Sequence, residues 1–389
     1  MKIAVDPWVL SSRFNYHGMQ VYARNLLAEF RRLAPAQDAV KICLFSSDRH
    51  ANGFHELGSV SGFEIVRAPS LRFDRFWRLG GLSRAASSIG ADMIFSPTAN
   101  ILPSRTVPVV CTIHDLTPVT ELSHGRKINA LLKTFMWASA KFARSLITVS
   151  ECSRNDIVEH YELPPEKVRV VYNGFDRAIF NTAPFGEDKL AQLRTKFGIN
   201  APYIAHHGTI QPRKNLVRLI QAYDLLLDRH PALDLQLVLM GPFGWHYQDV
   251  LRQGGRTRSK GKVIFTQALP DGDLSVLLKG AFLAVMPSLY EGFCMPMIEA
   301  MACGIPTIAA NSSCLPEISG NVLRYFDALS TEDMADKMES AILDTGLREQ
   351  LRRDGLERSN VFSWERCARE TIEVLIQAGS RPRPAAGGA

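Results

Sequence analysis

The sequence lacks the patterns by which cysteine marks a disulfide framework or a zinc site. Its seven cysteines are an odd number, and no two stand in C-x-x-C spacing among the 389 residues. Disulfide-rich domains and structural zinc sites are built from closely spaced cysteine pairs. We therefore expect reduced thiols and no zinc site, as in a cytoplasmic protein.

Long hydrophobic runs are missing too. No segment approaches the roughly 20 apolar residues that a membrane-spanning helix needs. The amino-terminal stretch "MKIAVDPWVL" carries a lysine, an acid and a proline, and lacks the apolar core of a signal peptide. We therefore expect a cytoplasmic location, with any membrane contact made peripherally at the inner face.

One segment is rich in arginine and aromatic residues. It is "LRFDRFWRLGGLSR", residues 71–84, in which Arg72, Arg75, Arg78 and Arg84 stand against Asp74 and alternate with Phe73, Phe76 and Trp77. The segment could contact anionic lipid head groups, since each basic residue contributes about 1 kcal/mol near such a surface. The more common arrangement is a helix with buried aromatics and solvated arginines. Nucleic acid is the least favoured partner, because no recognised nucleic-acid module accompanies the patch.

The order of apolar segments predicts an α/β fold with two doubly wound domains. Short apolar runs such as "DMIFSP", "SLITVS" and "LQLVLMG" alternate with segments of helical period. A chain of this length exceeds what one core usually supports. We predict Rossmann-like domains at residues 1–185 and 186–360, a helix at 361–379 that packs back on the first domain, and a disordered tail at 380–389. A ligand is expected in the cleft between the domains, at the carboxyl ends of the strands.

The stretch "HHGTIQPRKN", residues 206–215, has the features of a phosphate site. Gly208 permits a tight turn after a strand, and Arg213 and Lys214 precede a helix that Asn215 is expected to cap. Free amides at a helix start favour anions. The alternative is two solvated charges before a helix.

A second stretch, "SLYEGFCMPMIEAMACG", residues 288–304, places two acids around a loop and a helix. Pro296 suits the first position of that helix, Glu291 falls in the loop, and Glu299 is expected in the first helical turn. A carboxylate beside a diphosphate would repel it, so the acids are expected to accept hydrogen bonds from flanking hydroxyls. Two such acids fit a nucleotide sugar. Taken singly, each acid could instead face solvent or favour the helix dipole.

Taken together, these motifs resemble the retaining glycosyltransferases of the GT-B fold known as group 1 or family 4. "PSLYEGFCMPMIEAMACGIPTIAANSSCLPE" is similar to the family's signature with paired glutamates, and "GTIQPRKN" to its phosphate-binding segment. "TIHDL", "TVSECSRNDI" and "VVYNGFD" are similar to landmarks of its amino-terminal domain. The resemblance spans nearly the whole chain.

The resemblance implies roles for individual residues. Arg213 and Lys214 would neutralise the diphosphate, Glu299 would bind the ribose, and Glu291 and His114 would act catalytically beside the transferred sugar. The full donor-binding set that it implies is Gly18, Gly208, Arg213, Lys214, Glu291, Phe293, Cys294, Met295 and Glu299. The family usually has glycine where Cys294 stands and often has glycine where His17 stands. A side chain at position 294 is expected to narrow the pocket or to require an unusual backbone angle.

The resemblance also implies a reaction. A hexose would pass with retention from a nucleoside-diphosphate sugar to a saccharide or lipid-linked saccharide in surface polysaccharide (O-antigen) assembly, without a metal or other cofactor. GDP-mannose is the expected donor, with a GDP-deoxyhexose or a UDP-hexose as alternatives. Two other functions remain open at this point: a GT-B nucleotide-sugar epimerase and a catalytically silent carbohydrate-binding scaffold.

Overall fold

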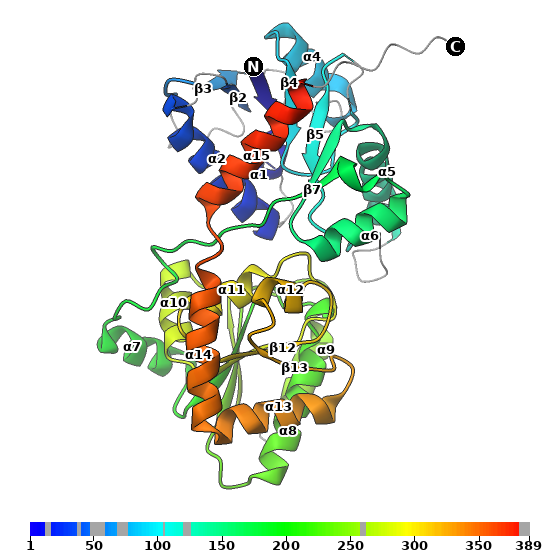
Figure 1. The fold of residues 1–389 in the computed structure, drawn as a ribbon. Coiled ribbons are helices and arrows are strands. Elements are labelled where there is room, and N and C mark those ends of the chain that lie inside the picture. Colours follow the sequence, from blue (N-terminus) through cyan, green and yellow to red (C-terminus); the bar gives the residue numbers. More distant parts are fainter. Residues whose placement is uncertain are drawn as a thin grey trace. The chain divides into compact units, whose positions relative to one another are not determined.

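The computed structural model describes residues 1–11, 17–36, 40–46, 59–67, 77–103, 106–119, 126–256 and 262–380. The chain divides into two units (Figure 1). The first contains Met1–Gly174 and the stretch from Ser363 onward, and the second contains Phe175–Phe362. Each unit has one parallel sheet covered by helices, so the predicted α/β class is confirmed.

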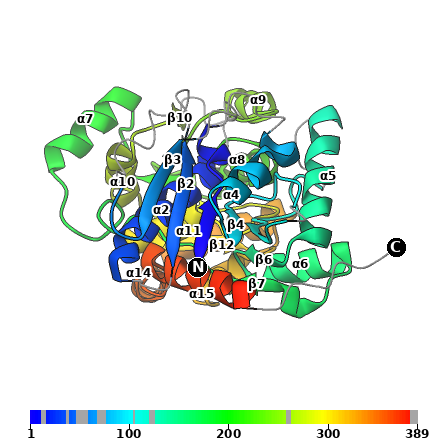
Figure 2. The same ribbon diagram turned by 90° about the horizontal axis from the view of Figure 1, so that it is seen from above.

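The sheet of the first unit has seven parallel strands in the order β3-β2-β1-β4-β5-β6-β7. All residues of β4, β5 and β6 are buried, as expected when helices cover both faces of a sheet. Figure 2 shows β2 and β3 side by side at one edge. The strands are β1 (Lys2–Val5), β2 (Lys41–Ser46), β3 (Phe63–Arg67), β4 (Met93–Ser96), β5 (Val109–Thr112), β6 (Ser145–Thr148) and β7 (Val168–Val170).

Helix α6 of the first unit begins at a cap that the sequence predicts. The predicted cap Ser150 accepts a hydrogen bond from the Ser153 backbone N–H at 3.1 Å and starts α6. The last helix, α15, packs on α2 (Figure 1). The helices are α1 (Trp8–Ser11), α2 (His17–Leu33), η1 (Ala34–Ala36), the π-helical η4 (Trp77–Gly81), α4 (Leu82–Ser88), α5 (Arg126–Phe142), α6 (Glu151–Tyr161), η5 (Pro165–Lys167) and α15 (Trp364–Ser380).

The arginine-rich segment at 71–84 is described only from Trp77 onward, and residues 71–76 lie outside the described part. The Trp77 side chain is fully buried, and its Nε1–H donates to Asp6 Oδ1 at 2.9 Å. The Arg78 guanidinium lies over the rings of Trp8 and Phe135, at 4.8 and 4.9 Å from their centroids. The alternative that Trp77 contacts lipid is therefore wrong, because an indole that donates a hydrogen bond to a buried carboxyl group belongs to the core. None of the helices described is long and apolar enough to cross a bilayer.

The second unit has six parallel strands in the order β10-β9-β8-β11-β12-β13. Helices α8 and α13 pack together, and α11 packs on α14 (Figure 1). Its strands are β8 (Tyr203–His207), β9 (Gln236–Met240), β10 (Val263–Gln267), β11 (Leu283–Met286), β12 (Thr307–Ala310) and β13 (Arg324–Phe326). Its helices are α7 (Glu187–Phe197), η6 (Pro212–Lys214), α8 (Leu216–Arg229), α9 (Gln248–Arg256), α10 (Asp271–Lys279), α11 (Met295–Ala302), α12 (Leu315–Ser319), α13 (Thr331–Leu343) and α14 (Thr345–Ser359).

The boundary between the units lies at Gly174–Phe175, earlier in the chain than the 185/186 boundary expected from sequence. The segment after Phe175 belongs to the second unit because its backbone is held there. Ser275 Oγ donates to the Ile179 carbonyl at 2.7 Å, and Lys279 Nζ donates to the Ala183 carbonyl at 3.0 Å. These contacts pair residues that lie far apart in sequence, so composition alone did not indicate them.

Candidate active site

The strand order of the second sheet determines where a ligand can bind. Counted within the unit, the order is 3-2-1-4-5-6, and the winding direction reverses between β8 and β11. In open parallel sheets, ligands bind at the carboxyl ends of the strands at this reversal. Residues 206–215 contain the end of β8 and the loop after it, and residues 288–304 follow β11, so the two predicted motifs meet at this switch point.

Two glycines bring the loops after β8 and β9 into contact. Gly208 and Gly241 both have positive φ, 134° and 141°, and a Cβ on Gly241 would lie 2.2 Å from the Gly208 carbonyl oxygen. A Cβ on Gly208 would in turn lie 3.5 Å from Lys214 Nζ and 3.8 Å from Pro296 Cγ. The predicted Gly208 turn therefore borders both the basic pair and the start of α11. Gly241 is a second required glycine that the sequence analysis did not assign.

The basic pair and the loop acid form one buried cluster, which we call the 213–214–291 cluster. Lys214 Nζ donates to Glu291 Oε1 at 2.5 Å, and the Arg213 guanidinium donates to Glu291 Oε2. Lys214 and Glu291 are each 4% exposed. Arg213 and Lys214 lie in the single turn η6, which presents both side chains to the same acid. The alternative of two solvated charges is therefore excluded for Lys214.

Glu291 is an ionised carboxylate in this cluster. Burial alone would raise its pKa, but the charges of Arg213 and Lys214 and their hydrogen bonds outweigh burial and lower the pKa to about 2. Glu291 therefore cannot donate a proton near neutral pH. It can orient the two cations and offer negative charge to a neighbouring group.

Serines on two loops hold Glu291 in place, and the sequence analysis did not assign them. Ser288 Oγ donates to Glu291 Oε1 at 2.8 Å. Ser313, which follows β12, accepts from the Glu291 backbone N–H at 3.1 Å and donates to its carbonyl. The loop after β12 thus supports the loop after β11. The string "NSSC" has no signal of its own that would predict this contact.

The second acid, Glu299, occupies a different position from the one expected. Helix α11 begins at Met295 after the N-cap Cys294, so Glu299 is its fifth residue and lies beyond the first turn. It is too far along the helix to be explained by the dipole at the helix start. Its Oε2 instead lies 2.8 Å from Nε2 of His207, the last residue of β8.

The loop before α11 has the strained backbone that the sequence predicts. Cys294 adopts φ 65° and ψ 61°, the left-handed region that favours glycine. Its side chain is 5% exposed, and the neighbouring Phe293 ring packs edge-on against Phe362 at 5.3 Å between centroids. Met295, at the start of α11, is partly exposed. The expectation of an unusual backbone angle at Cys294 is confirmed.

Cys294 is expected to resist alkylation in the folded protein. Burial raises the pKa of its thiol to about 12, so at pH 8 about one molecule in ten thousand carries the reactive thiolate. Cys152, on α6, is only half-buried and serves as the internal control. Iodoacetamide followed by peptide mass mapping should label Cys152 well before Cys294. Equal labelling rates would contradict the buried position of the thiol.

Asn215 does not cap helix α8 as expected. It adopts φ 58°, and its side-chain amide donates to the Ala328 carbonyl at 2.7 Å instead of accepting from the first turn. A residue in the left-handed conformation does not present its side chain to the helix amides in the usual way. Asn215 instead joins η6 to the segment after β13.

Two of the predicted site residues belong to the first unit. His114 follows β5, and its Nε2 donates to the Pro97 carbonyl at 3.0 Å while the Tyr22 ring packs edge-on at 4.6 Å between centroids. Burial lowers the pKa of His114, which favours the neutral imidazole. Gly18 is an exposed residue in the first turn of α2.

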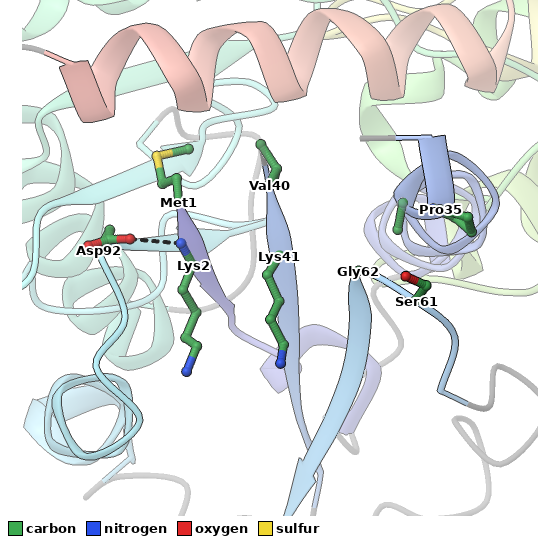
Figure 3. Close-up of a pocket in the computed structure, with 9 residues that line it drawn as sticks. Met1, Lys2, Pro35, Val40, Lys41, Ser61, Gly62 and Asp92 are labelled. Carbon is green, nitrogen blue, oxygen red and sulfur yellow. Dashed lines mark hydrogen bonds between the residues drawn. The ribbon is translucent and has the colours of Figure 1, made fainter. Parts of the chain in front are cut away.

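A cavity of about 410 Å³ in the first unit lies at the end of the sheet where the strands begin (Figure 3). It opens at the amino ends of β1 and β2, between Met1, Lys2, Lys41, Gly62 and Asp92. Lys2 Nζ donates to the Ile89 carbonyl, and Lys41 Nζ pairs with Glu64. Ligands of parallel sheets bind at the carboxyl ends. This cavity is therefore separate from the residues after β5.

No three His, Cys, Asp or Glu side chains gather as a metal-binding group in the part of the chain that the structure describes. The positive charge that the second unit offers at its switch point comes from Arg213 and Lys214.

Comparison with known proteins identifies both halves of the chain. Residues 16–178 match the family model Glycosyltransferase Family 4, and residues 191–358 match Glycosyl transferases group 1. O-antigen chain mannosyltransferase B of Escherichia coli is 30% identical over 73% of this chain and 74% of its own length. The α-maltose-1-phosphate synthase of Mycolicibacterium smegmatis is 27% identical over 92% of this chain and 95% of its own length.

Solved structures agree at the level of the fold. The Anabaena protein HepE in complex with UDP and glucose is 21% identical and superposes with a TM-score of 0.69 over 97% of this chain and 100% of that chain. WaaG, a glycosyltransferase involved in lipopolysaccharide biosynthesis, is 16% identical with a TM-score of 0.67 over 96% and 99%. The predicted GT-B fold class is confirmed.

Proposed function

Because this chain belongs to the family 4, group 1 glycosyltransferases, we propose that it moves mannose, with retention, from GDP-mannose to a lipid-linked saccharide of a surface polysaccharide. The donor would bind to the second unit, and the acceptor to the first. The similarity to an O-antigen mannosyltransferase supports mannose as the sugar and a polysaccharide as the product.

The observation that carries the proposal is the 213–214–291 cluster at the β8/β11 switch point. Two cations and one ionised acid leave a net charge of one positive unit in a mostly buried place. Breaking the bond between sugar and diphosphate creates negative charge on the leaving oxygen. Preorganised cations in a water-poor site stabilise such charge without rearranging.

The roles of the acids follow from this arrangement. Glu291 keeps Arg213 and Lys214 directed at the diphosphate and supplies negative charge near the anomeric carbon, where positive charge develops. It is not a proton donor, since its pKa is lowered to about 2. Glu299 would accept from the ribose hydroxyls. His114, which burial keeps as the neutral imidazole and whose Nε2–H donates to the Pro97 carbonyl, would hydrogen-bond the transferred sugar.

Donor identity can be tested with a panel of GDP, UDP and dTDP sugars in a thermal-shift assay. A ligand at a hundred times its dissociation constant stabilises the native state by about 2.7 kcal/mol, which shifts the midpoint by roughly 5–10 °C for a unit of this size. We expect the shift with GDP-mannose, and mannosyl transfer to a lipid-linked acceptor that is unchanged in EDTA. A shift with UDP sugars alone would overturn the choice of donor. Transfer that stops in EDTA and returns with magnesium would overturn the metal-independent reaction.

A further inference from the structure

His207 is a buried histidine that the reaction proposed above does not use. It ends β8, the strand between β9 and β11, and its side chain is 3% exposed. Its Nε2 lies 2.8 Å from Oε2 of Glu299, which lies on α11 after β11. The contact therefore joins β8 to the helix that follows β11, and the neighbouring Gly208 turn borders the start of the same helix.

The surroundings of the two ring nitrogens of His207 indicate which of them carries the proton. A carboxylate oxygen can only accept, so Nε2 of His207 must carry the hydrogen. The other ring nitrogen, Nδ1, is buried and meets no hydrogen-bond partner among the residues that the structure describes. A proton on Nδ1 would thus be buried without an acceptor, which is costly. His207 therefore presents one directed donor, on Nε2.

This donor fixes the carboxylate of Glu299. With Oε2 bonded to His207, the carboxyl plane cannot rotate freely, while Oε1 has no hydrogen-bond partner in the described part of the chain. The Glu299 side chain is 15% exposed, so Oε1 remains open to an incoming hydroxyl. A fixed acceptor binds a ligand with less loss of side-chain freedom than a mobile one.

We propose that His207 is a positioning residue that aims Glu299 at the ribose diol of the donor and thereby makes the site selective for ribonucleotides over nucleotides without those hydroxyls. This role rests on the proposed function, in which Glu299 binds the ribose. His207 acts on the nucleotide and leaves sugar transfer itself to the 213–214–291 cluster.

The test compares two ligands in three variants. GDP and 2′,3′-dideoxy-GDP, with UDP and 2′,3′-dideoxy-UDP as the second pair, are titrated calorimetrically into the wild type, His207→Leu and His207→Gln. Leucine fills the space without a donor, whereas the amide of glutamine can place N–H groups near the position of Nε2. Each protein is first checked for a cooperative thermal transition.

We expect His207→Leu to weaken ribonucleotide binding about tenfold, as loss of one oriented hydrogen bond does, and to leave dideoxynucleotide binding unchanged. The KM for the nucleotide sugar should rise by the same factor while kcat stays within about twofold. His207→Gln should recover most of the selectivity. The matched control is His206→Leu, since His206 bonds the Val285 carbonyl and no acid, and its selectivity should equal that of the wild type.

The positioning role would be overturned if His207→Leu weakened ribonucleotide and dideoxynucleotide binding equally, or if it lowered only kcat. It would also be overturned if His207→Gln recovered none of the selectivity. A wild type that binds GDP or UDP without preferring the ribose form would overturn it as well, and would leave the diphosphate site intact. A wild type that binds none of the four nucleotides would instead overturn the proposed function on which the role rests.

Discussion

Glu291→Gln is expected to lower the free energy of unfolding of the second unit by about 3–5 kcal/mol. The substitution removes the negative charge to which Lys214 and Arg213 are paired and leaves one almost fully buried ammonium and one mostly buried guanidinium unbalanced. Urea titration followed by circular dichroism measures the change. Loss of transfer in this variant must therefore be measured at a temperature where it is still folded.

Two controls separate the buried pair from the loss of an acid in general. Glu332→Gln makes the same chemical change at an exposed site in the first turn of α13 and should cost only a few tenths of a kcal/mol. Lys214→Met combined with Glu291→Gln removes one buried charge of each sign and should recover much of the loss. A cost below about 1 kcal/mol for Glu291→Gln would contradict the buried ion pair.

The ion pair of Glu291 with Lys214 and Arg213 should also make the stability of the protein depend on pH in acid. The pKa of Glu291 in the folded protein is lowered to about 2 from an ordinary value of 4.5, so its ionisation stabilises the fold fully above pH 4.5. This stabilisation is lost as pH falls from 4.5 toward 2. Stability of Glu291→Gln should therefore depend less on pH in that window than stability of the wild type.

Lys214→Met is expected to reduce kcat for sugar transfer about 10²–10³-fold. The ammonium is one of two preformed charges available to the leaving diphosphate, and removal of one such donor from a transition-state site costs a factor of this size. Methionine keeps the length of the side chain, and Glu291 keeps Arg213 as its partner. Initial rates with saturating donor measure the effect.

Lys189→Met is the matched control, because Lys189 pairs with Asp273 at the surface of the second unit and its side chain is 48% exposed. Its kcat should equal that of the wild type. Unchanged kcat in Lys214→Met would mean that the diphosphate departs without this ammonium, and the leaving-group role would be wrong.

The sequence predicted the fold class because its signals are local. Apolar runs of strand length, turn residues between them and the Ser150 cap are read within a few residues, and the structure has these elements. The domain boundary was less accurate, since the irregular segment after Phe175 is assigned to the second unit by bonds to Ser275 and Lys279, which lie far away in sequence.

The same difference between local and distant signals separates the site residues that the sequence predicted from those that it did not. Arg213, Lys214 and Glu291 stand in two short stretches that the reversal of strand order between β8 and β11 brings together. The partners that hold them, Ser288 and Ser313, have no distinctive pattern. The sequence holds one sign of His207, since two histidines end the otherwise apolar strand "YIAHH", but its partner Glu299 is recognised only once β8 and α11 are adjacent.

The account depends most on Arg213 and Lys214 binding the diphosphate of a nucleotide sugar, and calorimetry tests this directly. The nucleoside diphosphate selected by the donor panel and its free nucleoside are titrated into the wild type and Lys214→Met. We predict that the wild type binds the diphosphate at least about a hundredfold more tightly than the nucleoside, since each hydrogen bond to a charged group contributes about 1.5–3 kcal/mol, and that Lys214→Met loses most of this difference. Equal affinity for the two ligands in the wild type, or an unchanged difference in the variant, would contradict it.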